Sequence, residues 1–234
     1  MENKLSVILT MYNTAKLSEK IIKELVFQKI KYYPETEIIV INDCSSDDTS
    51  FINKYKDNIK YFNLKQNHGC AGARNVGLDN ATGQYIAFID GDDMTKRDYL
   101  HQIYQVARKN FDYNFLNWTL NGKEINPIFK FKEHPTEVQK ALWGYVFNRA
   151  NLQMGHFNEN INVDSEVEYL QKLLTKEMTY GIINKAIYDY NTLNENSLTR
   201  RFNRGEISKK KENNSPSKKG KIIYKRITKN THTS

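Results

Sequence analysis

The sequence of 234 residues predicts an α/β fold in which a mixed, mainly parallel β-sheet is flanked by helices. Short apolar runs alternate with helical patterns four times before about residue 95, which is the pattern of a parallel sheet covered by helices. The runs are almost continuously apolar, as expected for strands that are buried on both faces. Unusual polar residues follow the runs directly, at the sheet edge where open α/β folds bind ligands.

Each element of the first half follows from a local pattern. Apolar runs predict strands, Ser45 or Ser46 suits a helix N-cap, and Asp47 and Asp48 suit the first turn of that helix. Small residues between 67 and 77 predict a helix that packs closely on the sheet or on a ligand. The expected strands are 5–10, 37–41, 59–64 and 85–89, and the expected helices are 16–30, about 46–56 and one that opens at 67–77.

The second half, residues 96–204, is less regular. Residues 111–121 and 124–131 alternate as strands of a mixed sheet, and a helix is expected to run to about residue 176. From about residue 205 the chain is polar and strongly charged, which favours a flexible tail. Residues 222–224 form the one short element expected there.

Composition indicates a single globular unit. Residues 200–234 hold 12 Lys/Arg and 2 Asp/Glu, so most of the net charge of +8 lies in the tail and the body is close to neutral. A chain of this length buries one sizeable core, and two full domains would be cramped. We therefore expect one domain over residues 1–204, with halves 1–95 and 96–204, and a basic tail over 205–234.

The sequence also predicts the compartment. Two cysteines, Cys44 and Cys70, make no disulfide framework and fit a reducing compartment. The apolar run 5–9 is too short for a signal peptide, and no stretch approaches the ~20 apolar residues of a membrane span. We expect a cytoplasmic protein, with the tail in peripheral contact with the anionic inner face of the membrane. Nucleic acid is a disfavoured partner for the tail, a solubilising role is the simplest alternative, and nothing indicates an oligomeric state.

Three carboxylates, Asp90, Asp92 and Asp93, surround Gly91 directly after the strand at 85–89. Such a group repels itself unless a cation neutralises it, and Gly91 lets the chain turn where a larger residue would not fit. The economical interpretation is a hard divalent cation, Mn²⁺ or Mg²⁺, that is held by oxygen ligands and shared with phosphates. The alternative is an acidic surface turn that caps the next helix.

Four ordered motifs in the first hundred or so residues resemble the family 2 glycosyltransferases of the bacterial, non-processive type, which have the Rossmann-like GT-A fold. The motifs are residues 10–13, 40–49, 67–77 and 88–93. One departure is visible, because the family usually has two acids after the second strand and this chain has Asn42 and Asp43. The resemblance implies a metal-dependent, inverting enzyme that moves a hexose or N-acetylhexosamine from a UDP-sugar to a hydroxyl of a glycan, glycolipid or glycoprotein.

The resemblance also implies roles for individual residues. Asp43 would accept the uracil N–H, Arg74 would pair with the diphosphate or the acids, and Asp92 and Asp93 would hold the metal. Residues 187–200 resemble a lid over the diphosphate. The implied nucleotide-sugar-binding residues are Thr10, Tyr12, Asn13, Asp43, Arg74, Asp90, Gly91, Asp92, Trp143 and Arg200.

Each of these roles has a plainer alternative. Tyr12 suits an ordinary strand end and Trp143 suits core packing, while Asp43 suits a helix cap. The plainer alternative for Arg74 and Arg200 is an ordinary arginine on the protein surface.

Of the roles that the resemblance implies, that of the general base has the least support from the motif. Members usually carry Glu-Asp where this chain has Ser165-Glu166, so Glu166 would be the base, with Asp164 as the second choice. Alternatively, Asp164 caps a helix and Glu166 sits in its first turn. Three other functions stay open: a nucleotidyltransferase, an inactive nucleotide-sugar-binding module, and a basic-tailed nucleic-acid binder.

Overall fold

The computed structural model describes residues 4–124, 141–175, 177–195, 197–209 and 224–226. The strands are β1 (Leu5–Met11), β2 (Glu37–Asn42), β3 (Lys60–Leu64), β4 (Tyr85–Asp90), β5 (Met94–Thr95), β6 (Tyr113–Leu120), β7 (Lys123–Glu124), β8 (Tyr145–Asn148), β9 (Tyr180–Tyr190) and β10 (Tyr224–Arg226). The α-helices are α1 (Ala15–Tyr32), α2 (Gly69–Asn80), α3 (Tyr99–Ala107), α4 (Ser165–Leu173) and α5 (Leu198–Asn203), and two 3₁₀ helices are η1 (Ser50–Lys54) and η3 (Leu142–Gly144).

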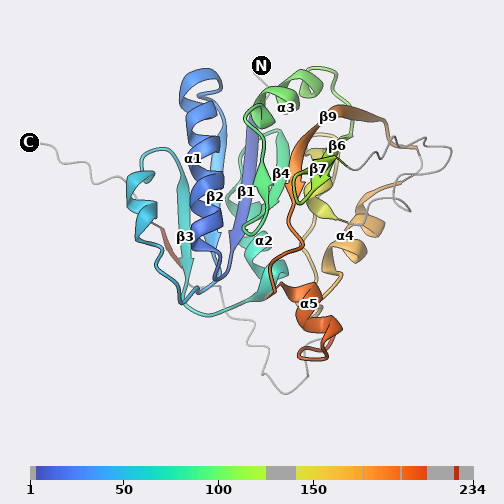
Figure 1. Ribbon diagram of the computed structural model, residues 1–234. Coiled ribbons are helices and arrows are strands. Elements are labelled where there is room, and N and C mark those ends of the chain that lie inside the picture. Colours follow the sequence, from blue (N-terminus) through green and yellow to red (C-terminus); the bar gives the residue numbers. More distant parts are fainter. Residues whose placement is uncertain (1–3, 125–140, 176, 196, 210–223, 227–234) are drawn as a thin grey trace, which may run out of the picture.

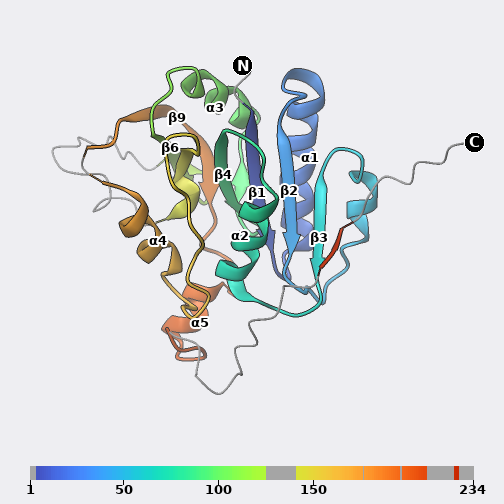
Figure 2. The ribbon, with the colours of Figure 1, turned by 180° about the vertical axis from the view of Figure 1, so that it is seen from behind.

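All of these strands join one sheet in the order β10-β3-β2-β1-β4-β8-β6-β9-β5, with β7 paired to β6. Strands β3, β2, β1 and β4 are parallel, whereas β8 runs antiparallel between β4 and β6. Helices α1 and α3 cover one face, and α2 and α4 cover the other (Figures 1 and 2). The mixed, mainly parallel sheet with helices on both faces confirms the predicted fold class.

The alternation of side chains along β1 explains the two layers. Val7 and Leu9 belong to the core under α1 and α3, and Ile8 belongs to the core under α2 and α4. Helix α2 lies very close to the sheet, because a Cβ added at Gly77 would come 2.4 Å from Ile8 Cγ2. The small residues predicted for close packing therefore let the second half of α2 lie directly on β1.

One predicted helix is wrong. Residues 46–56 were expected to form a helix capped by Ser45 or Ser46, but only the 3₁₀ helix η1 is present. Side chains of this segment instead bind the entry to α1: Ala15 N, in its first turn, donates to Asp47 Oδ2 at 2.7 Å, and Asn13 N, just before the helix, donates to Ser45 Oγ at 3.0 Å. The pattern was a true capping signal, but its partner is another helix.

In the second half, β6 confirms the strand expected at 111–121, and α4 ends at Leu173, short of residue 176. The strand expected at 124–131 lies almost entirely outside the described residues. Of the short element expected at 222–224, only Tyr224 is described, and it begins β10, which pairs with β3. Most of the tail, and with it the expected membrane contact, also lies outside the described residues. Within the described ranges, no helix is long and apolar enough to cross a bilayer.

A buried carboxylate fastens the amino-terminal end of the parallel sheet, opposite the strand ends that carry the motifs. Glu37 accepts hydrogen bonds from Ser6 Oγ, Lys60 Nζ and the main chain of Thr82. Burial raises the pKa of Glu37, but the bonds from Lys60, Ser6 and Thr82 outweigh burial and hold the pKa below its usual value. The ionised carboxylate therefore stabilises the fold.

We predict that Glu37→Gln lowers the free energy of unfolding by about 2 kcal/mol at neutral pH, because the partly buried Lys60 loses its counter-charge. The wild-type advantage should be complete above the ordinary pKa of glutamate and should shrink as the pH falls towards the lowered pKa of the native carboxylate. Urea unfolding at several pH values measures this effect. Glu19→Gln, which removes an exposed ion pair with Lys54, is the control and should change stability by less than about 1 kcal/mol. Equal effects of the two variants at every pH would contradict the prediction.

Candidate active site

The carboxyl ends of β1, β2 and β4 bring the sequence motifs together. Thr10 of β1 is in register with Asp90 of β4, and Met11 is in register with Asn42 of β2. Because these strands are parallel neighbours, the residues that follow them lie at one edge of the sheet. The expected meeting of the polar motifs is therefore a property of the fold.

Gly91 fits its position because there is no room for a side chain. A Cβ at this residue would lie 2.7 Å from Ser18 Oγ and 2.8 Å from both Thr10 O and Thr14 Oγ1. Its main chain is also fixed, since Gly91 N donates to Thr10 O at 2.9 Å and Ser18 Oγ donates to Gly91 O at 3.1 Å. The acidic turn is thus packed against the corner between β1 and α1.

The three acids of this turn have different surroundings. Asp90 is partly exposed and pairs with Arg74. Asp92 is half-buried, and its Oδ2 accepts from Asn194 Nδ2 at 2.7 Å. Asp93 is buried: Oδ2 accepts from the Tyr188 hydroxyl at 2.6 Å and Oδ1 from Asn191 N at 2.8 Å. This placement argues against the expected role of Asp93 as a metal ligand.

The carboxylates of the turn repel one another because they carry like charges. Burial, and then the charge of Asp90, raise the pKa of Asp92. Burial, followed by the charges of Asp90 and Asp92, raises the pKa of Asp93 to about 9. A cation at the turn would relieve this repulsion, and the donor atoms on offer are carboxylate oxygens, which suit Mn²⁺ or Mg²⁺. Among the described residues, no group of three or more His, Cys, Asp or Glu side chains is placed to hold a metal ion. An ion at the turn would therefore need further ligands, such as phosphate oxygens.

Arg74 joins the acidic turn to the second half of the chain. Its side chain is 3% exposed, and its two terminal nitrogens lie 2.8 Å from Asp90 Oδ1 and 3.4 Å from Glu166 Oε2. The guanidinium also lies over the Phe157 ring, with its carbon 5.7 Å from the ring centroid. Arg74 is therefore buried, which removes the alternative of an ordinary surface arginine.

Cys70, one turn before Arg74 on α2, is a neutral neighbour of this cluster. Burial raises the pKa of the Cys70 thiol to about 12, and the lowering effect of Arg74 does not compensate. The thiolate needed for nucleophilic chemistry is thus disfavoured.

The structure separates the two acids proposed as bases. Glu166, in the first turn of α4, reaches the site through Arg74, and its side chain is 31% exposed. Asp164 has a left-handed backbone (φ 66°) and an exposed side chain that pairs with Lys209 at 3.0 Å. In the described chain, the Asp164 side chain does not cap α4. The geometry favours Glu166.

Asp43 is buried at the end of β2 and caps the start of α2. Its Oδ1 accepts from His68 N at 2.7 Å, and its Oδ2 accepts from Gly69 N at 2.9 Å. Asp43 therefore acts as a helix cap, as the alternative interpretation predicted, and the helix that it caps is α2. The departure at Asn42 has a local reason, because its amide donates to Tyr61 and Asn63 and accepts from Ser45 N.

Trp143 lies in the core. It is 5% exposed and stacks on Tyr188, with ring centroids 4.6 Å apart and planes at 3°. Its other stacking partner, Tyr190, is half-buried, and the pKa of Tyr190 is raised by burial and then by Asp93, Asp90, Asp92 and Glu166. Sequence reasoning missed Tyr190, which brings an aromatic face close to the acids. The sequence signal that could have pointed to Tyr190 was the group of aromatic residues at the end of β9.

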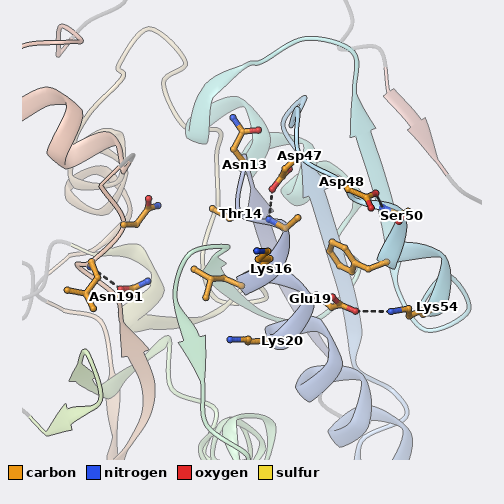
Figure 3. A pocket seen from close by; sticks show the side chains of 15 residues that line it. Asn13, Thr14, Lys16, Glu19, Lys20, Asp47, Asp48, Ser50, Lys54 and Asn191 are labelled. Atoms are coloured by element: carbon orange, nitrogen blue, oxygen red, sulfur yellow. Dashed lines mark hydrogen bonds and ion pairs between the residues drawn. The ribbon is translucent and has the colours of Figure 1, made fainter.

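An open cavity of about 930 Å³ lies at the start of α1 (Figure 3). Asn13, Lys16 and Lys20 line it at the start of α1, and Asn191 and Asn194 line it on the side of the acids. Asn191 and Asn194 also donate to Asp92, so the cavity and the turn share a wall. Tyr12, the first residue of the β1–α1 loop, is 46% exposed. Arg200 lies on α5, where its Nε donates to Thr192 O at 3.0 Å.

We predict that Arg74→Lys lowers the free energy of unfolding by about 1–3 kcal/mol, because one ammonium group cannot reproduce the planar contacts to Asp90 and Glu166. Denaturant titration measures this change. Arg108→Lys, at an exposed position, is the matched control and should stay within about 0.5 kcal/mol of the wild type. An Arg74→Lys variant as stable as the control would show that the buried contacts contribute nothing.

Comparisons with known proteins identify the family of the chain. The model of the family described as Glycosyl transferase family 2 matches residues 6–177. The GalNAc(5)-diNAcBac-PP-undecaprenol beta-1,3-glucosyltransferase of Campylobacter jejuni is 33% identical over 215 residues, which cover 84% of this chain and 67% of the relative.

Two solved structures share the fold. TarS 1–349 of S. aureus in complex with UDP-GlcNAc has a TM-score of 0.68 at 22% identity and covers 84% of this chain. The mannosyltransferase PcManGT of Pyrobaculum calidifontis, in complex with GDP-Man and Mn²⁺, has a TM-score of 0.65 at 17% identity and covers 86% of this chain. This chain spans 60% and 61% of these two proteins, respectively. The family match and the relative together identify the chain as a glycosyltransferase that belongs to glycosyl transferase family 2.

Proposed function

We propose that the chain is a metal-dependent, inverting glycosyltransferase. It transfers a hexose or N-acetylhexosamine from a UDP-sugar to a hydroxyl of a glycan, glycolipid or glycoprotein. The observation that carries the proposal is the buried Arg74, which holds Asp90 of the donor side and Glu166 of the acceptor side in one site. The UDP-GlcNAc complex of TarS and the lipid-linked acceptor in the name of the Campylobacter relative agree with these substrate classes.

The uridine would bind at the ends of β1 and β2. Asp43 accepts hydrogen bonds from His68 N and Gly69 N, and its carboxylate would also accept the uracil N–H. Thr10 and Asn13 would line the same pocket, and the exposed ring of Tyr12 would stack on the base. Trp143 would support the sugar site through Tyr190, which it stacks against.

The metal would be Mn²⁺ or Mg²⁺, held by Asp92 together with Asp90. A bound ion of this kind stabilises the negative charge that develops on a departing diphosphate. Asp92 would exchange its bond to Asn194 for this role, and Asp93 would stay outside the ligand set because its carboxylate is buried against Tyr188 and Asn191. Arg200 would close over the diphosphate from α5.

Glu166 would be the general base. It accepts the proton of the acceptor hydroxyl, whose oxygen forms a bond to the anomeric carbon while the bond from that carbon to the UDP oxygen breaks. Attack on the face opposite the diphosphate inverts the anomeric centre. Arg74 would orient Glu166 through the contact between its guanidinium and Oε2.

A second function, a nucleotide-sugar-binding module without transfer activity, has one observation in its favour. The candidate base is a Glu tied to Arg74 at a position where the family usually has Asp. Such a module would bind the UDP-sugar tightly and would not turn it over. A panel of nucleotide sugars, scored by thermal shift with Mn²⁺ and then by release of UDP, distinguishes the two functions.

For the metal, we predict that Asp92→Asn lowers Mn²⁺-dependent release of UDP from its UDP-sugar by about 100-fold or more, because the ion loses a charged ligand. Asp79→Asn, an exposed change on α2, should leave the rate unchanged. The measurement is the initial rate against Mn²⁺ concentration. A wild-type response of Asp92→Asn to Mn²⁺ would remove Asp92 from the ligand set.

For the base, we predict that Glu166→Gln lowers kcat by about 100-fold or more while the Kd for UDP changes by less than about threefold, since only proton transfer is lost. Asp164→Asn should keep kcat close to that of the wild type. Transfer kinetics and calorimetric titration with UDP measure the two quantities. The reverse result, with kcat lost in Asp164→Asn and retained in Glu166→Gln, would move the base to Asp164.

A further inference from the structure

We propose that Tyr188 and Asp93 form a positioning pair that fixes Asp90 and Asp92 in the orientation needed to bind the metal–diphosphate group. This inference rests on the proposed function. Neither residue of the pair would touch the metal or the substrate. They would act through the main chain of the acidic turn.

The Tyr188 hydroxyl connects the first and the last acid of the turn. It accepts a hydrogen bond from Asp90 N at 3.2 Å and donates one to Asp93 Oδ2 at 2.6 Å. Asp93 N also donates to Asp90 O at 3.1 Å, which closes the turn. A single phenol from β9 therefore fixes both ends of the segment that carries Asp92.

The other oxygen of Asp93 extends this connection to the end of β9. Asp93 Oδ1 accepts from Asn191 N, and Asn191 Nδ2 in turn donates to Asp92 O at 2.8 Å. On its opposite side, the turn is bonded to β1 through Gly91 N and Thr10 O. The main chain of each acid thus has a fixed neighbour, while the side chains of Asp90 and Asp92 remain partly exposed.

The position of the hydroxyl is set independently of these bonds. Tyr188 is fully buried, and its ring stacks on Trp143. Removal of the hydroxyl should therefore leave the ring in place and release the turn. Outer-shell partners of this kind orient metal ligands, and their loss typically weakens metal binding about 10–100-fold.

The test measures the Kd for UDP with and without Mn²⁺ by calorimetry, in the wild type, Tyr188→Phe, Asp93→Asn and the double variant. The Kd without Mn²⁺ divided by the Kd with Mn²⁺ is the Mn²⁺ ratio, which reports the contribution of the metal to UDP binding. We expect each single variant to reduce this ratio about 10-fold, with the Kd in the absence of Mn²⁺ unchanged. The double variant should match the single ones, because both residues act through one network.

Tyr99→Phe is the matched control. Tyr99 is also fully buried, but within the described chain its hydroxyl has no hydrogen-bond partner, so its loss should leave the ratio unchanged. Asn191→Ala, which removes the side-chain bond to Asp92 O, gives a second route if Tyr188→Phe folds poorly, and it should reduce the ratio in the same direction.

Two negative results are distinguishable. A wild type whose UDP affinity does not respond to Mn²⁺ would overturn the proposed metal dependence, and the positioning role with it. A wild type that responds, with variants that are less stable but keep the full Mn²⁺ ratio, would overturn the positioning role alone and make the pair purely structural. Additive effects in the double variant would likewise contradict a shared network.

Discussion

The interaction on which the site depends is the burial of the Arg74 guanidinium between Asp90 and Glu166. A buried cation is tolerated only where opposite charges and hydrogen bonds compensate it, so α2, β4 and α4 must meet at this point. The close approach of Gly77 to Ile8 brings α2 to the sheet, and the position of α4 brings Glu166. The ion pairs of this one arginine therefore join the two halves of the domain.

The sequence was sufficient for the elements whose signals are local. The runs that became β1, β2 and β4 are mostly apolar and almost wholly buried, and a parallel arrangement places the residues after them at one edge. For the same reason, the grouping of Thr10, Asp43 and Asp90 could be predicted. The family motifs refined this picture, and the family match agrees with it.

The roles of individual acids could not be predicted, because they depend on partners that are distant in the sequence. Asp93 faces inward since Tyr188 of β9 donates to it, and Asp47 caps α1 and not the helix expected after it. Asp43 caps α2 in the same way. Identical carboxylates in one motif thus acquire different functions from tertiary contacts alone, and no spacing rule along the chain contains that information.

The crowding at Gly91 limits how this site can be rebuilt. Two of the atoms that exclude a Cβ belong to the side chains of Thr14 and Ser18, but the third is the main-chain oxygen of Thr10. Trimming the two side chains would therefore not admit a larger residue, and the corner between β1 and α1 would itself have to shift. A designer who grafts an acidic loop from a relative with a bulkier central residue must transplant residues 10–18 as well. The two segments behave as one exchangeable module.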